Sequence, residues 1–414
     1  MTATATDPIT STDRAIITEL AQRYAAACTD NERLIEAWTR HNMLQGGKPL
    51  MLLFPEGGWC EIEAENPMQC SNTRLHGLER HLRQGLYENQ HFAHDKVVSP
   101  SIDVNCGIRT SGWGLEAEWT HSAAERGARR FKPVLHTIDD AERITAPTVS
   151  VDAVAGAADL AWHQDLVEAH IPVRSVGIKQ IGYHLMCQYT AWRGLEETMM
   201  DFYCEPDLVH AAMQRLVAGH QALLDQYRAL GLLNGNADNT YQGTGGNGWC
   251  TDLPDHGPVA SNQMWSSAES QEMAGVGPAQ HAEFCVPYES QLLANFGRNA
   301  YGCCEPLHDR IETVLAMPNM HRVSISPWAD VRRSAEALAN HRAIFSWKPN
   351  PALLCGSFNQ DAVRADIATT IAICAEHNCQ LEIILKDTHC CDREPWRFTR
   401  WSEICREEID RVWG

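Results

Sequence analysis

Hydrophobic positions along the chain follow two spacings, one typical of helices and one typical of strands. In the N-terminal part, helical spacing runs over residues 13–41 and 72–88, and a short apolar strand is predicted over 48–54. Residues 105–150 follow neither spacing and are rich in Gly and Trp, so we interpret them as an insertion or a sheet edge. Residues 1–12 precede the first periodic segment and are predicted to form a flexible tail.

From residue 152 onward, predicted strands and helices follow one another at short intervals. The C-terminal part repeats one unit four times, a short apolar strand followed by a helix. The four strands are predicted at 299–304, 321–326, 343–347 and 381–386. Strands that alternate with helices in this way run parallel and are joined by crossover helices. At least six such units favour an α/β fold, a (β/α)8 TIM-type barrel with an N-terminal helical extension, and we expect residues 13–414 to form this single domain.

Composition and charge exclude several classes of function. The chain has 414 residues, of which 44% are hydrophobic and 21% charged, as in ordinary globular proteins. Its formal net charge of −19 argues against binding to nucleic acid or to an anionic membrane surface. No apolar run approaches the ~18 residues of a membrane helix, and the N-terminus lacks the basic and apolar regions of a secretory signal. We therefore expect a cytoplasmic protein, a monomer or a homodimer, that acts on a small molecule.

Reactive side chains gather where the predicted C-terminal strands end, which is where β/α barrels place their catalytic groups. Cys303, Cys304 and Glu305 lie at the end of one strand, and Asp-Thr-His-Cys-Cys follows another at residues 387–391. Thiolates and imidazoles are zinc ligands, so these two strand ends are predicted to share one Zn²⁺. The predicted metal ligands are Cys303, Cys304, His389 and Cys390. The alternative is that these cysteines are buried and inert, which is the commoner fate of cysteine.

Other polar and aromatic residues near the strand ends are candidates for catalysis or substrate binding. The catalytic candidates are Glu305, Lys348, Asp387 and His184, and the substrate-binding candidates are Trp265, Tyr288, Trp328 and Asn350. Lys348 either holds an anionic group of the substrate or pairs with Asp330, and Asp387 is placed to pair with Lys386. For His184, Trp265 and Tyr288 the alternative is a structural role, and for Asn350 it is capping of a loop. No Gly-x-Gly-x-x-Gly fingerprint follows a strand and no Walker A loop is present, so nucleotide binding has no support.

Three segments carry a resemblance to a known family. FGRNAYGCCEPLHDRIETVLAMPNMHRVSISPWADV, KPNPALL and LEIILKDTH resemble the uroporphyrinogen decarboxylase-like superfamily, and more closely its branch with the Tyr-Gly-Cys-Cys-Glu-Pro signature. The resemblance covers about residues 150–414. It implies a β/α barrel, in a superfamily that includes the decarboxylase of haem synthesis and zinc methyltransferases that move methyl groups between corrinoids and thiols.

This resemblance implies a zinc-dependent methyltransferase that moves a methyl group from a small methylated donor, or from a corrinoid on a partner protein, to a thiol acceptor. Tyr301-Gly302-Cys303 stands where such methyltransferases carry His-x-Cys, so Glu305 or His389 would replace the missing His ligand. Cys390 or Cys391 would match the later Cys ligand. The Arg pair that grips propionates in the decarboxylase is not found.

Two other functions remain open on the sequence. One is a metal-free decarboxylase or lyase that acts on a small carboxylic acid and uses a carboxylate and a lysine for acid–base chemistry. The other is a non-catalytic ligand-binding barrel, against which the crowded thiol cluster argues.

Overall fold

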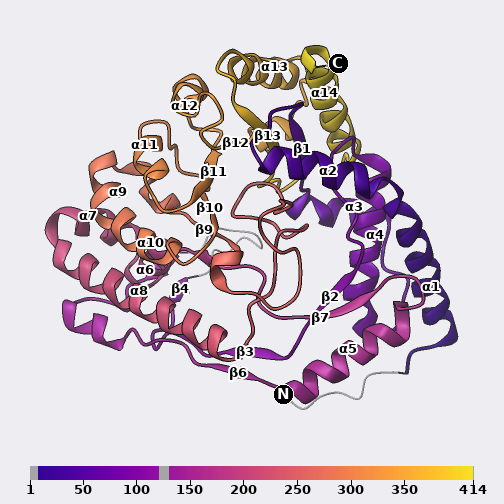
Figure 1. Ribbon diagram of the computed structural model, residues 1–414, viewed down its shortest axis with the longest axis horizontal. Helices are drawn as coiled ribbons and strands as arrows, with labels where there is room; N and C mark the ends of the chain where they lie inside the picture. The colour runs from indigo at the N-terminus through magenta and orange to yellow at the C-terminus, as the bar shows by residue number, and fades with distance from the viewer. Residues whose placement is uncertain (1–7, 121–129, 414) are drawn as a thin grey trace.

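The computed structural model describes residues 8–120 and 130–413, in which helices and strands alternate (Figure 1). The α-helices are α1 (Ser11–Ala26), α2 (Asn31–Asn42), α3 (Trp59–Glu65), α4 (His76–His91), α5 (Ala153–Val167), α6 (Leu185–Arg193), α7 (Leu195–Cys204), α8 (Pro206–Ala229), α9 (Pro278–Phe284), α10 (Val286–Leu293), α11 (Ile311–Leu315), α12 (Val331–Ala337), α13 (Gln360–Glu376) and α14 (Trp396–Trp413). The strands are β1 (Leu50–Leu53), β2 (Ile102–Asn105), β3 (Ile108–Thr110), β4 (Glu118–Thr120), β5 (Arg130–Lys132), β6 (Val149–Val151), β7 (Val173–Val176), β8 (Gly182–Tyr183), β9 (Trp265–Ala268), β10 (Arg298–Tyr301), β11 (Met320–Ile325), β12 (Ile344–Trp347) and β13 (Gln380–Leu385).

Seven strands form one sheet in the order β1-β13-β12-β11-β10-β9-β8, and every neighbouring pair in it is parallel. The four predicted C-terminal strands, β10 to β13, are consecutive neighbours, which confirms their predicted order and direction. A helix follows each of them and returns the chain to the start of the sheet. The α/β class is therefore confirmed, and the carboxyl ends of all seven strands lie along one edge.

The strand pairing does not show a closed barrel. Within the described residues, β1 and β8 are the edges of the seven-stranded sheet, and β2 and β7 pair with each other in a separate parallel ladder. β8 is only two residues long, and the segment after α8 touches the chain near β7 through a single bridge, Ile178 to Leu233. Between residues 8 and 120 and between 130 and 413, no eighth strand therefore joins this sheet. The irregular segment at 105–150 contains the short antiparallel pairs β3–β6 and β4–β5.

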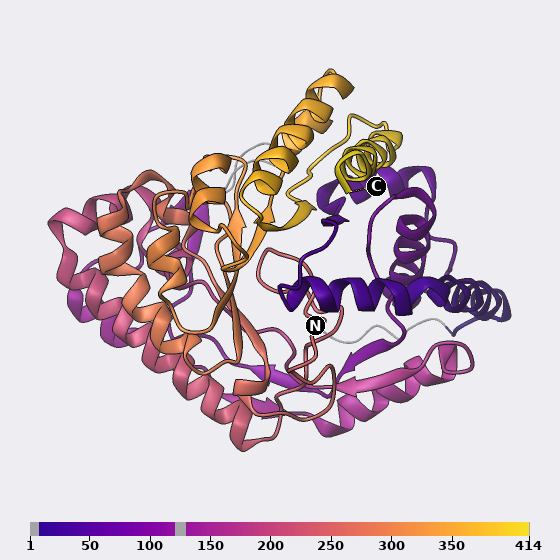
Figure 2. The same cartoon turned by 45° about the horizontal axis from the view of Figure 1, so that its top comes forward.

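The first N-terminal helix begins two residues earlier than predicted, and the segment predicted as one helix over 13–41 forms two helices, α1 and α2. α1 starts at Ser11 because Thr10 caps it: Asp13 N donates to Thr10 Oγ1 at 3.0 Å, and Thr10 N donates to Asp13 Oδ2 at 3.1 Å. The first seven residues of the predicted tail lie outside the described residues. Figures 1 and 2 show α1–α4 at one end of the molecule and α6–α11 at the other, with the sheet between them.

None of the helices in the described ranges is long and apolar enough to span a lipid bilayer.

A buried ion cluster joins the middle strands beneath the carboxyl edge. Glu382 on β13 is fully buried, and its carboxylate lies 2.9 Å from Arg322 Nε of β11 and 3.2 Å from His41 Nε2 of α2. Ser346 Oγ of β12 donates to the same carboxylate at 2.5 Å. Burial alone would raise the pKa of Glu382, but the Arg322 charge and the His41 hydrogen bond hold it well below its ordinary value. The carboxylate is thus ionised at neutral pH and ties three strands and one helix together.

We predict that Glu382→Ala lowers the free energy of unfolding by about 3–5 kcal/mol, because it leaves the Arg322 guanidinium buried without its counter-charge. The matched control is Glu376→Ala, which removes an exposed carboxylate 2.9 Å from Arg332 on the protein surface. This control costs at most about 1 kcal/mol, since exposed ion pairs contribute little. Urea denaturation of both variants measures the difference, and equal losses would contradict the prediction.

Candidate functional site

A cavity of about 180 Å³ opens at the carboxyl ends of β8, β9 and β10. Its walls include His184 after β8, Glu269 after β9, Gly302 after β10, and Tyr241 and Thr244 from the long loop between α8 and β9. This is the edge at which parallel α/β folds place their ligands. The cavity is therefore the natural starting point for the functional site.

His184 and Glu269 form a hydrogen-bonded pair in the cavity wall. His184 Nδ1 lies 2.7 Å from Glu269 Oε1, and the second carboxylate oxygen accepts a hydrogen bond from Gln271 N at 2.9 Å. The bond to Glu269 raises the pKa of His184. Because Nδ1 is engaged by a buried carboxylate, the ring is oriented and Nε2, beside Gly182, is left for a substrate.

Two adjacent thiols lie next to this cavity. β10 ends at Tyr301, earlier than predicted, because Gly302 takes a φ of +99° that turns the chain out of the strand. Cys303 and Cys304 therefore lie in the loop after the strand, with their Sγ atoms 3.6 Å apart. A turn, rather than strand alternation, is what lets both side chains face the same way.

Lys386 and Asp387, from the end of β13, complete this thiol cluster. Lys386 Nζ lies 3.9 Å from Cys303 Sγ, and Asp387 Oδ2 lies 4.0 Å from Cys304 Sγ. Lys386 and Asp387 pair with each other at 3.0 Å, which confirms the pairing predicted for them. Side chains from two non-adjacent strands of the sheet thus meet at its carboxyl edge.

The two thiols differ in acidity because they share a hydrogen bond. The bond from the Cys303 thiol lowers the pKa of Cys304 to about 7, against burial and the Asp387 charge, which both raise it. The same bond, together with burial, raises the pKa of Cys303. The pair therefore loses one proton near neutral pH and keeps the other, and this first deprotonation belongs to the pair of sulfur atoms.

Glu305 is fully buried behind the thiols. Its carboxylate accepts hydrogen bonds from Cys303 N at 2.9 Å and from Ser270 N at 3.2 Å. Burial and the charge of Glu269 raise the pKa of Glu305 to about 7. The two backbone contacts show that Glu305 holds the Cys303 turn against the loop that carries Glu269.

The second predicted ligand cluster makes different contacts. Cys390 Sγ lies 3.2 Å from Cys355 Sγ in the loop after β12, and Cys391 Sγ donates to Glu61 Oε2 at 3.1 Å. The backbone of His389 packs on Gly57, where a Cβ atom would come within 3.0 Å of the His389 Cα. In the ranges that the structure describes, no group of three or more His, Cys, Asp or Glu side chains is arranged to hold a metal ion. The structure brings Cys303 and Cys304 together with Asp387, not with the predicted His389 and Cys390.

Lys348 lies beneath the site instead of on its surface. Its Nζ donates to Ser346 O at 2.9 Å and to Ser346 Oγ at 2.7 Å, and burial lowers its pKa to about 7. The alternative pairing with Asp330 is wrong, because Asp330 caps α12 by accepting from Arg333 N at 3.0 Å. Asn350 accepts from Ala352 N at 3.0 Å and so caps the short helix that follows it.

The predicted substrate-binding aromatics are not in the cavity wall. Trp265 is fully buried in β9, where its Nε1 donates to Gly248 O at 3.0 Å. The Tyr288 hydroxyl on α10 lies 2.7 Å from His210 Nδ1 on α8. Trp328 is 67% exposed in the loop after β11. The cavity wall instead uses short polar side chains and Tyr241.

Sequence reasoning missed three residues of the site, Glu56, Tyr241 and Glu269. Glu269 follows β9 as Glu305 follows β10, so a carboxylate just after a strand was a signal that could have identified it. Glu56 accepts from Asp387 N at 2.9 Å, a contact between residues far apart in the sequence. Tyr241 lies in the long irregular loop between α8 and β9, and no sequence pattern indicates its position.

Comparison with known proteins identifies a related fold only. No family model matches the chain, and no curated protein matches it in sequence. Among solved structures, a methyltransferase from Methanosarcina mazei is similar with a TM-score of 0.50 and 10% identity, over 92% of this chain and 99% of that one. At this identity the likeness concerns the fold. This chain resembles that Methanosarcina mazei protein in fold.

We predict that Cys304 is the fast-reacting thiol of the cluster, since the thiolate is the form that is alkylated. Iodoacetamide labelling followed across pH should show a phase with a midpoint near the pKa of about 7 assigned to Cys304. Cys304→Ser removes this phase, whereas Cys204→Ser, which removes an exposed thiol on α7, leaves it unchanged. Persistence of the phase in Cys304→Ser would contradict the assignment.

Proposed function

We propose that this chain is an enzyme that transfers a methyl group to a thiol-type acceptor at the cavity beside Cys303. The observation that carries the proposal is the arrangement of an oriented base, the His184–Glu269 pair, in the wall of a cavity that adjoins the Cys303–Cys304 pair. The fold likeness to a methyltransferase over 92% of the chain supports the reaction class. We also propose that the remaining strands complete the ring, so that the fold is a closed barrel of the uroporphyrinogen decarboxylase-like type.

The reaction requires a base and a methyl donor. The acceptor thiol gives its proton to Nε2 of His184, whose opposite nitrogen is held by Glu269 at 2.7 Å. The acceptor sulfur then attacks the methyl carbon, an S–C bond forms, and the bond from carbon to the leaving atom breaks. The leaving atom departs with the electron pair, and the proton on His184 passes to solvent. Because the Glu269 carboxyl group lies 2.7 Å from Nδ1, it stabilises the imidazolium that this transfer creates.

The charges around the cavity favour a positively charged or metal-bound methyl group over an anionic donor. The Glu269 carboxyl group lines the cavity, those of Glu56 and Asp387 belong to the adjoining thiol cluster, and the Lys386 ammonium is already paired with Asp387 at 3.0 Å. A methyl group on an ammonium or sulfonium centre, or on the cobalt of a corrinoid, would meet negative charge here. We propose a donor of one of these classes.

Zinc and a corrinoid partner protein, which the family resemblance implies, stay predictions. Two thiols beside a carboxylate are donor groups of the kind that zinc binds. In this fold, however, Lys386 Nζ lies 3.9 Å from Cys303 Sγ and 3.0 Å from Asp387 Oδ2, so that an ammonium already balances these groups. The residues as arranged do not fit a zinc ion. The proton transfer and the displacement described above therefore involve no zinc.

The alternative function is a metal-free decarboxylase or lyase that acts on a small carboxylic acid. Glu305 and Lys348, both with pKa values of about 7, are the acid–base groups that such an enzyme would use. Both side chains are buried, and Lys348 is held by Ser346. Their burial away from the cavity is the reason that methyl transfer is preferred.

We predict methyl transfer from a deuterium-labelled donor to 2-mercaptoethanol, detected as labelled thioether by mass spectrometry. The donors are a methylammonium compound, a methylsulfonium compound and methylcobalamin, each assayed with and without added zinc. His184→Asn should lower the rate by at least about 10²-fold, the usual contribution of a general base. The control His163→Asn removes a histidine on α5 and leaves the rate unchanged. Absence of labelled thioether with all three donors, or release of carbon dioxide from small carboxylic acids in its place, would overturn the proposal.

We predict that the acidic limb of the pH–rate profile belongs to His184. The base must be unprotonated, so activity rises with pH as the imidazolium loses its proton. The bond to Glu269 raises the pKa of His184 from 6.5, which places this limb above pH 6.5. Glu269→Gln removes the charge that raises the pKa, and the limb in kcat/KM should move to lower pH while kcat falls. A limb that keeps its position in Glu269→Gln would show that another group is the base.

A further inference from the structure

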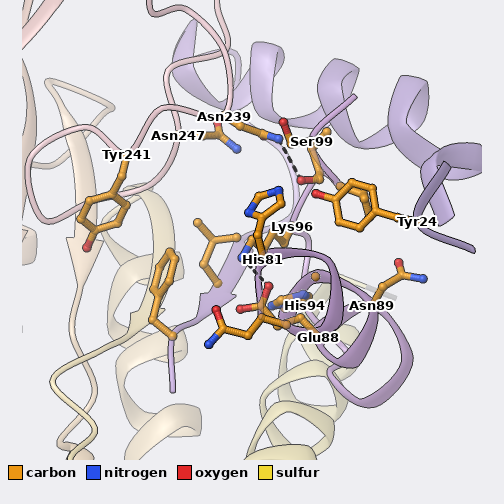
Figure 3. A pocket seen from close by; sticks show the side chains of 16 residues that line it. Tyr24, His81, Glu88, Asn89, His94, Lys96, Ser99, Asn239, Tyr241 and Asn247 are labelled. Carbon is orange, nitrogen blue, oxygen red and sulfur yellow. Dashed lines mark hydrogen bonds and ion pairs between the residues drawn. The ribbon is translucent and has the colours of Figure 1, made fainter. Parts of the chain in front are cut away.

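A second cavity, of about 190 Å³, lies between the N-terminal helices and the carboxyl end of β1 (Figure 3). α1 contributes Tyr24 and α4 contributes His81, while His94 comes from the segment after α4 and Asn247 from the loop between α8 and β9. Tyr241 lines both this cavity and the one beside His184. By contrast, the lining of the cavity beside His184 includes none of Tyr24, His81, His94 and Asn247.

Three polar atoms of this cavity's lining have no hydrogen-bond partner in the described part of the protein. One is the hydroxyl of Tyr241, which stands in the wall shared with the first cavity. The other two belong to this cavity alone, and they are Nδ1 of His94 and the side-chain oxygen Oδ1 of Asn247, a residue that is only 4% exposed. Figure 3 shows the two side chains on opposite sides of the cavity. Buried polar atoms are nearly always paired, and leaving one unpaired costs about 1–3 kcal/mol. A bound molecule that reaches both atoms would remove this cost.

The lining carries no uncompensated charge. Lys96 and Glu88, the charged residues that line the cavity, are paired with each other. Burial lowers the pKa of His94 well below its ordinary value and also lowers that of His81, so both rings are neutral at pH 7. A charged ligand would lose its hydration here without gaining a counter-charge. Neutral imidazoles and amides both donate and accept, so they suit an uncharged ligand with both kinds of group.

The shape of the cavity suits a flat ring. The rings of Phe54 and Tyr241 meet edge to face with centroids 5.2 Å apart, and those of Tyr24 and His81 lie 5.6 Å apart. These rings provide aromatic faces, and aromatic faces stack or pack edge-on against other rings. A cavity of 150 Å³ is large enough for benzene, so about 190 Å³ accommodates a ring system somewhat larger.

We infer that this second cavity is a binding site for an uncharged, planar heteroaromatic ring whose edge atoms hydrogen-bond with Asn247 and His94. The inference rests on the cavity, the unpartnered atoms of His94 and Asn247, and its neutral, ring-lined walls. It does not rest on the proposed methyl transfer, and failure of the transfer assay leaves it standing.

The test uses the full chain with benzimidazole and adenine as neutral heteroaromatic probes, and with benzoate and toluene as controls. Benzoate carries a charge, and toluene has no hydrogen-bonding edge. Titration by saturation-transfer NMR should show binding of the two heterocycles and much weaker binding of the controls. Asn247→Leu should weaken binding of the heterocycles by about tenfold, the equivalent of one hydrogen bond near 1.4 kcal/mol. Asn262→Leu, which replaces an exposed Asn in the short helix before β9, should leave it unchanged.

A measurement on the unmutated protein guards against a folding defect in Asn247→Leu. The imidazole resonance of His94 in histidine-labelled protein, identified by its loss in His94→Gln, should shift on addition of benzimidazole. Failure of both heterocycles to bind at millimolar concentration would overturn the inference. Binding that leaves the His94 resonance unmoved, or benzoate binding as tightly as benzimidazole, would also overturn it.

Discussion

Because the seven strands of the sheet are all parallel, every loop that follows a strand lies at the same edge of the sheet. Residues that follow β8, β9, β10 and β13, such as His184 and Asp387, more than 200 positions apart in the sequence, meet there because of this one constraint. The buried cluster of Glu382, Arg322 and His41 lies underneath and joins three strands and a helix into one support. The distances within the thiol cluster depend on that support, since Lys386 directly follows β13, the strand that carries Glu382. The position of the site therefore depends first on the parallel direction of the strands, and only then on single residues.

The buried charges below the edge also affect the groups on it. Lys348 is buried between the Glu382 cluster and the thiols, and its pKa is lowered to about 7 because burial outweighs the attraction of Glu382. Arg322, whose guanidinium lies 5.1 Å from the ring of Trp265, is similarly enclosed. Ionisable groups in such an interior stay charged only when a partner is fixed beside them. The charge of an ionisable side chain near the edge therefore depends on whether a partner is fixed beside it in the interior.

The repeating strand–helix pattern was enough to predict the order and direction of β10 to β13, because local periodicity and chain alternation determine both. The strand ends were predicted less well. The turn at Gly302 depends on a positive φ, and Asp387 also adopts a positive φ of 58°, which no hydrophobic pattern reveals. The contact of Cys390 with Cys355, and of Glu56 with Asp387, arises from tertiary packing between loops. The Cys303–Cys304 and Lys386–Asp387 pairs could be expected as neighbours, and the place of Glu269 directly after β9 was a usable signal, whereas the position of Tyr241 depends on how the loop after α8 folds.

Tyr241 is a common wall between the two cavities, and this arrangement has a thermodynamic consequence. Its ring faces the neutral cavity in Figure 3, while burial and the nearby charges of Glu56 and Asp387 hold the pKa of its hydroxyl well above the ordinary value. A ligand in one cavity that displaced this ring would change the shape of the other cavity. The affinity of each cavity would then change by the same factor when the other is filled. One phenol side chain therefore forms part of two binding spaces, and a substitution of Tyr241 alters the walls of both.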